Sequence, residues 1–131
     1  MHPVSLPPVR IPESDYGRLA GVAWQAAEDF HPVAGFLLDE LRRATVVPES
    51  ELPIDIVALN GWVTYRFDRG WRAESRVLVC PQDYRSAAVH LSVLSPLGAA
   101  LVGLRVGDRI SYSSIEGIAH VASVESLDAP L

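Results

Sequence analysis

The spacing of hydrophobic residues divides the chain into a helical part and a strand part. Up to about residue 43, apolar residues recur every three to four positions, which predicts amphipathic helices; from residue 54 onward they alternate with polar residues, which predicts strands. Residues 1–12 fit neither pattern because they include four prolines, and we expect an extended tail with little capacity to pack. The pattern is typical of an α+β protein with its helices first.

Two short helices are predicted between residues 13 and 47. The first spans about residues 14–29, with Ser14 or Asp15 as its N-cap. The Phe-His-Pro sequence at residues 30–32 ends it, because the residue before a proline is pushed out of the α region. The apolar positions of this helix are Leu19, Val22, Ala23, Ala26 and Phe30.

The second helix has an apolar side and a charged side. The apolar residues are Val33, Phe36, Leu37, Leu38 and Leu41. The residues expected to face away from them, or to flank them, are Asp39, Glu40, Arg42 and Arg43. Since only three residues separate the two helices, we expect an antiparallel hairpin. Residues 48–53, with two prolines and two acids, form a linker after it.

Residues 54–131 are predicted to form a mostly antiparallel sheet with one short helix packed on it. The predicted strands are 62–67, 71–80, 89–94, 109–113 and 118–127. Ser95 and Pro96 open the short helix, which runs through Leu101, since proline is well tolerated in a first helical turn. This arrangement is an α+β unit.

One segment is hydrophobic enough to suggest a membrane span. Residues 86–104 contain no Asp, Glu, Lys or Arg, and the segment is almost as long as a transmembrane helix. It also contains a proline, two glycines and three serines, and its pattern changes from alternation to a compact apolar block. We therefore predict a strand followed by a short helix, and no membrane association.

Composition and charge exclude several kinds of partner and site. The chain has 131 residues, which suits one domain with a small appendage, and its net charge of −5 arises from 16 acidic residues and 11 arginines. An acidic chain repels phosphate backbones, so direct DNA or RNA binding is not expected. A single cysteine excludes an internal disulfide and a multi-cysteine zinc site. The N-terminus lacks the features of a secretory signal, which favours a cytoplasmic location.

Residue types that often form metal, catalytic or binding sites are scattered along this sequence. The four histidines are His2, His31, His90 and His120. Their spacing does not match that of metal ligands, so we expect no bound metal and no other cofactor. The tryptophans are expected to be packing residues: Trp24, Trp62 and Trp71. Cys80 is expected to be a small buried hydrophobe. A basic cluster across the first β-hairpin is either a solvated face or a contact for an acidic protein surface: Arg66, Arg69, Arg72 and Arg76.

Two stretches of the sequence resemble a known family. Residues 91–108, LSVLSPLGAALVGLRVGD, resemble the C-terminal domain of the bacterial Gre transcript-cleavage factors, in which a strand is followed by Ser-Pro, a short Ala/Leu-rich helix and a Val-Gly-Asp turn. Upstream, LDELRRA at 38–44, PESELP at 48–53 and DIVALN at 55–60 are similar to the Gre-like regulators of the Rnk type. The similarity covers roughly residues 15–127, and the order and spacing of the motifs make it specific.

The resemblance implies a fold and a partner. It implies an FKBP-like antiparallel sheet over residues 54–131, preceded by a shortened two-helix arm, and docking on RNA polymerase at the rim of its secondary channel. In Gre factors the arm enters the channel, and an acidic pair at its tip holds the Mg²⁺ used to cleave backtracked RNA. Rnk-type proteins look like competitors for the same site with a shorter arm.

The resemblance also points to particular residues. Ser95, Pro96 and Leu97 occupy the loop that belongs to the polymerase-binding patch of Gre-type domains, although a helix start alone also explains them. Glu28 and Asp29 lie beside the hairpin turn, and adjacent carboxylates are suited to a hard divalent cation. A helix of this length reaches only about 24 Å, at 1.5 Å per residue, which is short for a Gre arm. We therefore expect the acidic tip either to remain solvated or to contact the channel wall, and not to cleave RNA.

The sequence thus favours a monomeric, non-catalytic regulator of transcription elongation that binds RNA polymerase. One alternative is Mg²⁺-dependent stimulation of transcript cleavage, which would require Glu28 and Asp29. Another is a peptidyl-prolyl isomerase, suggested by the FKBP-like fold, but the predicted sheet offers few aromatic residues for a deep pocket. Rnk stands for regulator of nucleoside diphosphate kinase, and only this family name implies a link to that kinase.

Overall fold

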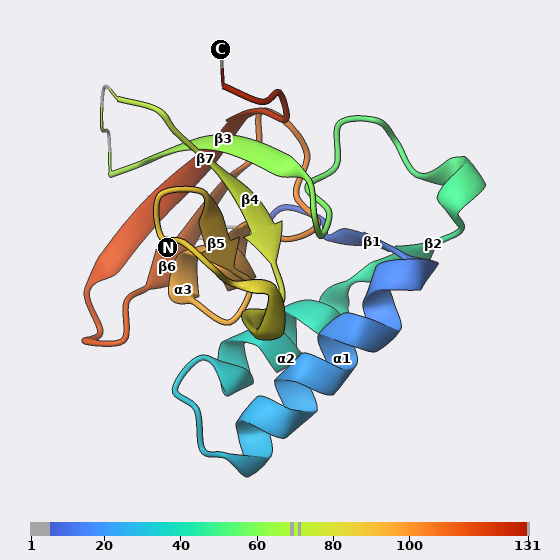
Figure 1. Ribbon diagram of the computed structural model, residues 1–131, viewed down its shortest axis with the longest axis vertical. Coiled ribbons are helices and arrows are strands. Elements are labelled where there is room, and N and C mark those ends of the chain that lie inside the picture. The colour runs from blue at the N-terminus through green and yellow to red at the C-terminus, as the bar shows by residue number, and fades with distance from the viewer. Residues whose placement is uncertain (1–5, 69, 71, 131) are drawn as a thin grey trace, which may run out of the picture.

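A computed structural model describes residues 6–68, 70 and 72–130. Figure 1 shows a two-helix hairpin on one side of the molecule and a curled sheet on the other, with a short helix between them. The hairpin consists of α1 (Glu13–Glu28) and α2 (Ala34–Arg43), and the short helix is α3 (Pro96–Leu101). The expected α+β class, with a hairpin before a mostly antiparallel sheet, is confirmed.

The main sheet has five strands in the order β5-β4-β3-β7-β6. Their bounds are Trp62–Phe67 for β3, Glu74–Val79 for β4, His90–Ser92 for β5, Arg109–Ser113 for β6 and Ala119–Ser126 for β7. Every pair is antiparallel except β4 with β5, where the intervening chain makes a crossover. The predicted strand at 71–80 begins later, at Glu74, and the one at 89–94 is only three residues long.

The uncharged segment at 86–104 forms the short strand and the short helix that its pattern predicts. Strand β5 and helix α3 together account for nine of its residues, and α3 contains only six. Among the described residues, no helix has both the length and the apolar character needed to cross a bilayer.

The helical hairpin packs against the sheet domain along its length. Leu19 and Ala23 of α1 are fully buried, as is Leu37 of α2, and they join one hydrophobic cluster with Val63 and Ile110 of the sheet. Helix α2 also contacts α3. The inner faces of both helices thus anchor the hairpin on the domain, while the turn between α1 and α2 forms one end of the molecule (Figure 1).

The segment before α1 is packed, which corrects the expectation of a loose tail. Val9 and Ile11 are almost completely buried in the core. Strand β1 (Arg10–Pro12) pairs in parallel with β2 (Thr45–Val47), and the amide of Arg10 donates to the Gly103 carbonyl at 2.9 Å. The prolines favour an extended chain, and the alternation of Val9 and Ile11 directs both apolar side chains inward. Residues 1–5 of the expected tail lie outside the described residues.

Gly103 makes the close contact with this segment possible. Its φ is +78°, and a Cβ atom there would lie 2.5 Å from Cγ1 of Val9 and 2.9 Å from the carbonyl oxygen of Arg10. Only glycine combines this backbone angle with such an approach. Gly103, two residues after α3, is thus fitted to the buried N-terminal strand.

The start of α1 differs from the prediction. Pro12 precedes the helix, and neither Ser14 nor Asp15 caps it. The Ser14 amide donates to the Glu49 carboxylate at 3.0 Å, in the 3-10 helix η1 (Glu49–Glu51) that occupies the predicted linker. Asp15 is buried and accepts a hydrogen bond from the Leu59 amide at 3.1 Å. Burial raises the pKa of the Asp15 carboxyl.

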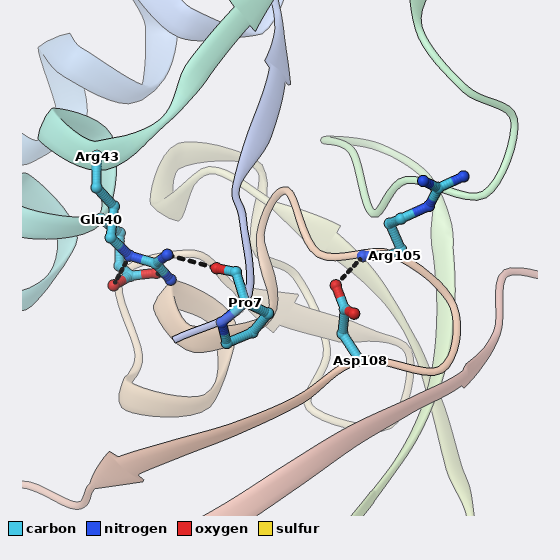
Figure 2. Close-up of polar contacts among 5 residues, drawn as sticks. All are labelled: Pro7, Glu40, Arg43, Arg105 and Asp108. Atoms are coloured by element: carbon cyan, nitrogen blue, oxygen red, sulfur yellow. Dashed lines mark hydrogen bonds and ion pairs between the residues drawn. The ribbon is translucent and has the colours of Figure 1, made fainter. Parts of the chain in front are cut away.

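Helix α2 buries an acid that was expected on its charged side. Glu40 is 1% exposed, and the guanidinium of Arg43 binds it through two bonds, Nε to Oε1 at 2.9 Å and Nη2 to Oε2 at 2.7 Å. Arg43 also donates to the carbonyl oxygen of Pro7, so the pair joins the hairpin to the N-terminal segment (Figure 2). The paired arginine one turn later is what makes burial of the carboxylate tolerable.

Candidate functional site

The turn between β5 and α3 is tightly built. Ser95 is the N-cap of α3: its hydroxyl accepts from the Gly98 amide at 3.0 Å and donates to the Ser92 carbonyl at 2.7 Å. A Cβ atom on Gly98 would lie 1.9 Å from the same Ser92 oxygen, so only glycine fits there. The predicted start of the short helix at Ser95 and Pro96 is confirmed, and the turn presents Pro96 in a rigid frame.

The other two loop residues differ in their surroundings. Leu97 is partly buried and packs against the core, whereas Pro96, also half-exposed, lines a groove. Leu97 therefore anchors the turn in the core, and Pro96 contributes to the surface.

The hairpin tip is an exposed turn with an aromatic residue at its end. Glu28, Asp29 and Phe30 are all exposed, and Phe30 is 93% exposed. Asp29 accepts from the side-chain amide of Gln25 at 3.5 Å, and the ring Nδ1 of His31 accepts from a backbone amide in the turn at 3.1 Å. Phe30 was expected among the apolar positions of α1, but it leaves the helix because its φ is +55°.

Left-handed backbone is rare for a large side chain. An exposed aromatic residue held in this conformation is unexplained by packing, and such strain is concentrated at functional positions. The sequence alone showed no sign of it, because Phe30 continues the helical spacing of α1.

Two grooves join the hairpin tip to the Ser-Pro turn. The first, about 540 Å³, runs along α1 and reaches Asp29, with Pro81, Gln82 and Leu94 on its other side. The second, about 380 Å³, has Pro32, Val33 and Phe36 on one side, and Pro96 with part of β6 on the other. We call the hairpin turn 28–33, the turn 94–96 and these two grooves the docking face. The two turns therefore line the same grooves, through Asp29 and Leu94 in the first and Pro32 and Pro96 in the second, whereas Glu28, Ser95 and Leu97 line neither.

The charges on this face are few. Arg18 of α1 lies 3.9 Å from Asp83 in the 3-10 helix η2 (Pro81–Asp83), and both are about half-exposed. Within the described ranges, no three His, Cys, Asp or Glu side chains come together closely enough to hold a metal ion. The face is therefore mainly apolar, with an acidic edge at Glu28 and Asp29.

A polar cluster on the sheet was missed by the sequence analysis. His120 of β7 pairs with Asp68, and its ring stacks on Tyr112 of β6 with 5.4 Å between centroids. The hydrogen bond from His120, with one from the Val121 amide, lowers the pKa of Asp68. Counting outward from a two-residue turn at Glu116 and Gly117 would have paired Tyr112 with Val121, one position from its observed partner His120, and nothing local links either strand to Asp68.

The remaining sequence expectations have mixed outcomes. Cys80 is buried, as expected. Trp24 is 59% exposed, so its expected packing role is wrong; it lies on the outer side of α1. Trp71 and Arg69 lie outside the described residues. In the basic cluster, Arg66 lies 3.3 Å from Glu125 and Arg76 donates to the Ala87 carbonyl at 2.9 Å, so both serve contacts within the sheet domain.

Comparison with known proteins agrees with this architecture in both halves. The family model described as "Rnk N-terminus" matches residues 7–47, and the model described as "Transcription elongation factor, GreA/GreB, C-term" matches residues 52–127. The chain is 35% identical over 125 residues to the regulator of nucleoside diphosphate kinase of Escherichia coli strain K12, which covers 95% of this chain and 92% of that protein.

Two further similarities concern elongation factors. Transcription elongation factor GreA of Thermotoga neapolitana is 37% identical over 86 residues, 65% of this chain and 54% of that protein. The solved structure of a prokaryotic transcription elongation factor GreA/GreB from Nitrosomonas europaea superimposes with a TM-score of 0.72 at 28% identity, over 92% of this chain and 99% of that one.

Proposed function

Because the chain belongs to the GreA/GreB family of transcription elongation factors, with the N-terminal region of the Rnk type, we propose that it binds RNA polymerase at the rim of the secondary channel without catalysing a reaction. It acts there as a monomer and competes with Gre factors for the same position. The observation that carries the proposal is that the Ser-Pro turn and the hairpin tip share one docking face.

The length and placement of the hairpin favour a role at the channel mouth. Helix α1 has 16 residues, which correspond to about 24 Å. Helix α2 packs on α3, so the hairpin that carries Glu28 and Asp29 is held in a fixed position relative to the sheet domain. On the polymerase they would occupy the entrance of the channel, and Phe30 would rest on its wall.

The chemistry of the docking face suits a modest, reversible protein interface. A rigid apolar centre at Pro96, with an exposed aromatic residue and an acidic edge nearby, resembles the arrangement of anchor residues within a polar rim. The net charge of −5 disfavours direct contact with RNA or DNA in the same complex. Polymerase protein surface with basic residues is the complementary partner.

One observation supports a second candidate function, Mg²⁺-dependent stimulation of transcript cleavage. Glu28 and Asp29 are adjacent and exposed at the tip, where carboxylate oxygens suit a hard cation. No third acidic or histidine side chain joins them in the described part of the chain. The pair alone is a poor metal site, and we place the second function below the first.

An assay on stalled polymerase separates the two functions. Backtracked elongation complexes are incubated with the chain alone, with a Gre factor alone and with both, and RNA fragment release is followed on gels. We expect no release by the chain alone and slower release when it is added to the Gre factor. Fragment release by the chain, lost in the Glu28→Ala and Asp29→Ala double variant, would establish the cleavage function instead.

Binding to purified core polymerase identifies the docking face. Phe30→Gly and the double variant Glu28→Ala, Asp29→Ala are each expected to weaken binding about tenfold. Glu51→Ala is the matched control, because Glu51 is an exposed acid in the 48–53 linker, outside the docking face. Equal affinity for all of these variants would exclude the hairpin tip from the interface. If the chain bound purified nucleoside diphosphate kinase and did not bind core polymerase, the proposed partner would be wrong.

A further inference from the structure

Strand β6 forms one edge of the main sheet and is longer than the other edge strand. It pairs with β7 on one side only, and it has five residues, whereas β5 at the opposite edge has three. Folded proteins normally protect such edges with charges, prolines, bulges or a covering segment. Residues 110–113 of β6 contain no charge and no proline.

The direction of the backbone groups of β6 follows from its register. Tyr112 lies opposite His120, and beyond the strand the Ser114 amide donates to the Ile118 carbonyl at 2.9 Å. Hydrogen-bonded and non-hydrogen-bonded positions alternate in an antiparallel ladder. Tyr112 therefore directs its N–H and C=O groups toward β7, and Ser111 and Ser113 direct theirs toward the open edge.

A groove runs beside this open edge. It is the 380 Å³ groove of the docking face, lined by Ser111, Tyr112 and Ser113 in succession. Side chains of consecutive strand residues point to opposite faces, so a groove lined by all three must lie at the edge. Its other lining residues are all apolar: Pro32, Val33, Phe36, Pro96 and Ile115.

We propose that the edge of β6 accepts an extended, uncharged peptide segment of a partner protein as a sixth strand. The outward N–H and C=O groups of Ser111 and Ser113 bind the peptide backbone. An apolar side chain of the peptide rests between Phe36 and Pro96. The groove belongs to the docking face, but this proposal does not rest on polymerase binding, because peptide binding is tested with the chain alone.

The chemistry of the groove selects this occupant over others. Outward backbone groups two residues apart match an extended chain, which repeats its own donors and acceptors at that interval. The volume is at the lower end of the range for small-ligand pockets, about 300–1,000 Å³, so it admits one chain. A second copy pairing through β6 would bring a whole domain against Pro32 and Phe36, and each copy carries a charge of −5.

The test uses a capped, uncharged heptapeptide of alternating valine and threonine, and the same peptide with every backbone amide between these residues N-methylated. The methylated peptide has the same charge and side chains but lacks the donors that a strand needs. Binding is followed by ¹H–¹⁵N NMR of the full chain. We expect the unmethylated peptide to shift the amides of Ser111 and Ser113 and the signals of Phe36, and the methylated peptide to bind at least tenfold more weakly.

Two variants at one position provide matched controls. Ser111→Pro removes an outward N–H without removing a bond to β7, and is expected to weaken peptide binding about tenfold. Ser111→Thr keeps the amide and is expected to change binding less than twofold. Equal binding of the two peptides, or shifts at β5 or along α1 in place of β6, would overturn the proposal, whether or not Ser111→Pro folds. A dimer in sedimentation equilibrium that Ser111→Pro dissociates would also overturn it, because the occupant would be a second copy.

Discussion

The pair formed by Glu40 and Arg43 is expected to be the most sensitive polar contact in the fold. The Glu40 side chain is 2% exposed and that of Arg43 25%. Arg43→Met keeps most of the apolar stem but removes the guanidinium, which leaves the carboxylate buried without its partner and the Pro7 carbonyl without a donor (Figure 2). Breaking a buried pair in this way costs about 3–5 kcal/mol.

The lower end of that range applies here, because water reaches the partly exposed arginine. We therefore expect Arg43→Met to lower the free energy of unfolding by about 3 kcal/mol, and the melting temperature by about 10 °C for a chain of this size. Glu40→Gln keeps an acceptor without the charge and should cost about 1 kcal/mol. Replacing both residues, Glu40→Leu with Arg43→Met, removes the unpaired charge and should cost less than Arg43→Met alone.

Chemical denaturation followed by circular dichroism compares the parent chain, Glu40→Leu, Arg43→Met and their double variant in a double-mutant cycle, with Glu40→Gln measured beside them. The order of stability is the critical result. If Arg43→Met cost less than about 1 kcal/mol, or if the double variant were less stable than Arg43→Met, the pair would not be a coupled buried contact and the reasoning would fail.

Three further predictions concern other parts of the molecule. Gly98→Ala should lower the free energy of unfolding by about 3 kcal/mol because its Cβ meets the Ser92 carbonyl. Gly21→Ala, with no atom within 4 Å of its Cβ, should instead stabilise α1 by about 0.5–1 kcal/mol. Equal effects of the two variants in chemical denaturation would refute the crowding at the turn. Burial raises the pKa of Asp15 above 3.8, so its stabilising contribution is full below pH 3.8 and is lost as the pH rises through the folded-state value. Asp15→Asn should therefore gain stability relative to the parent chain as the pH rises from 3.8 through the folded-state pKa of Asp15, and a pH-independent difference in unfolding free energy would contradict this. Phe30→Gly removes left-handed strain from an exposed residue and should leave the fold unchanged or stabilise it by about 0.5 kcal/mol, while a loss above 1 kcal/mol would show that Phe30 packs.

The sequence predicted the elements whose residues repeat with a clear period or carry a local signal. Strand β3 follows the alternation of residues 62–67, and α3 begins where Ser95 and Pro96 predicted it. These features depend on neighbours within a few positions. Local pattern is therefore sufficient for most of the main sheet and for the turn before α3.

The features that the sequence did not reveal depend on distant partners. Asp15 is buried because it binds a backbone amide 44 residues away, and Val9 is buried because Gly103 leaves room for it. Likewise, the approach of Pro32 to Pro96 follows from how the hairpin packs on α3. No local pattern encodes these contacts, which explains why the acidic tip and the Ser-Pro turn were predicted separately and not as one surface.

The most direct test of the proposed function is a displacement titration on RNA polymerase. A fluorescently labelled Gre factor is bound to bacterial core enzyme, and the unlabelled chain is added while anisotropy is followed. We predict complete displacement along a single-site competition curve, and a shift of that curve to about tenfold higher concentration for the Glu28→Ala and Asp29→Ala double variant. Full retention of the Gre factor at saturating concentrations of the chain would contradict docking at the secondary channel.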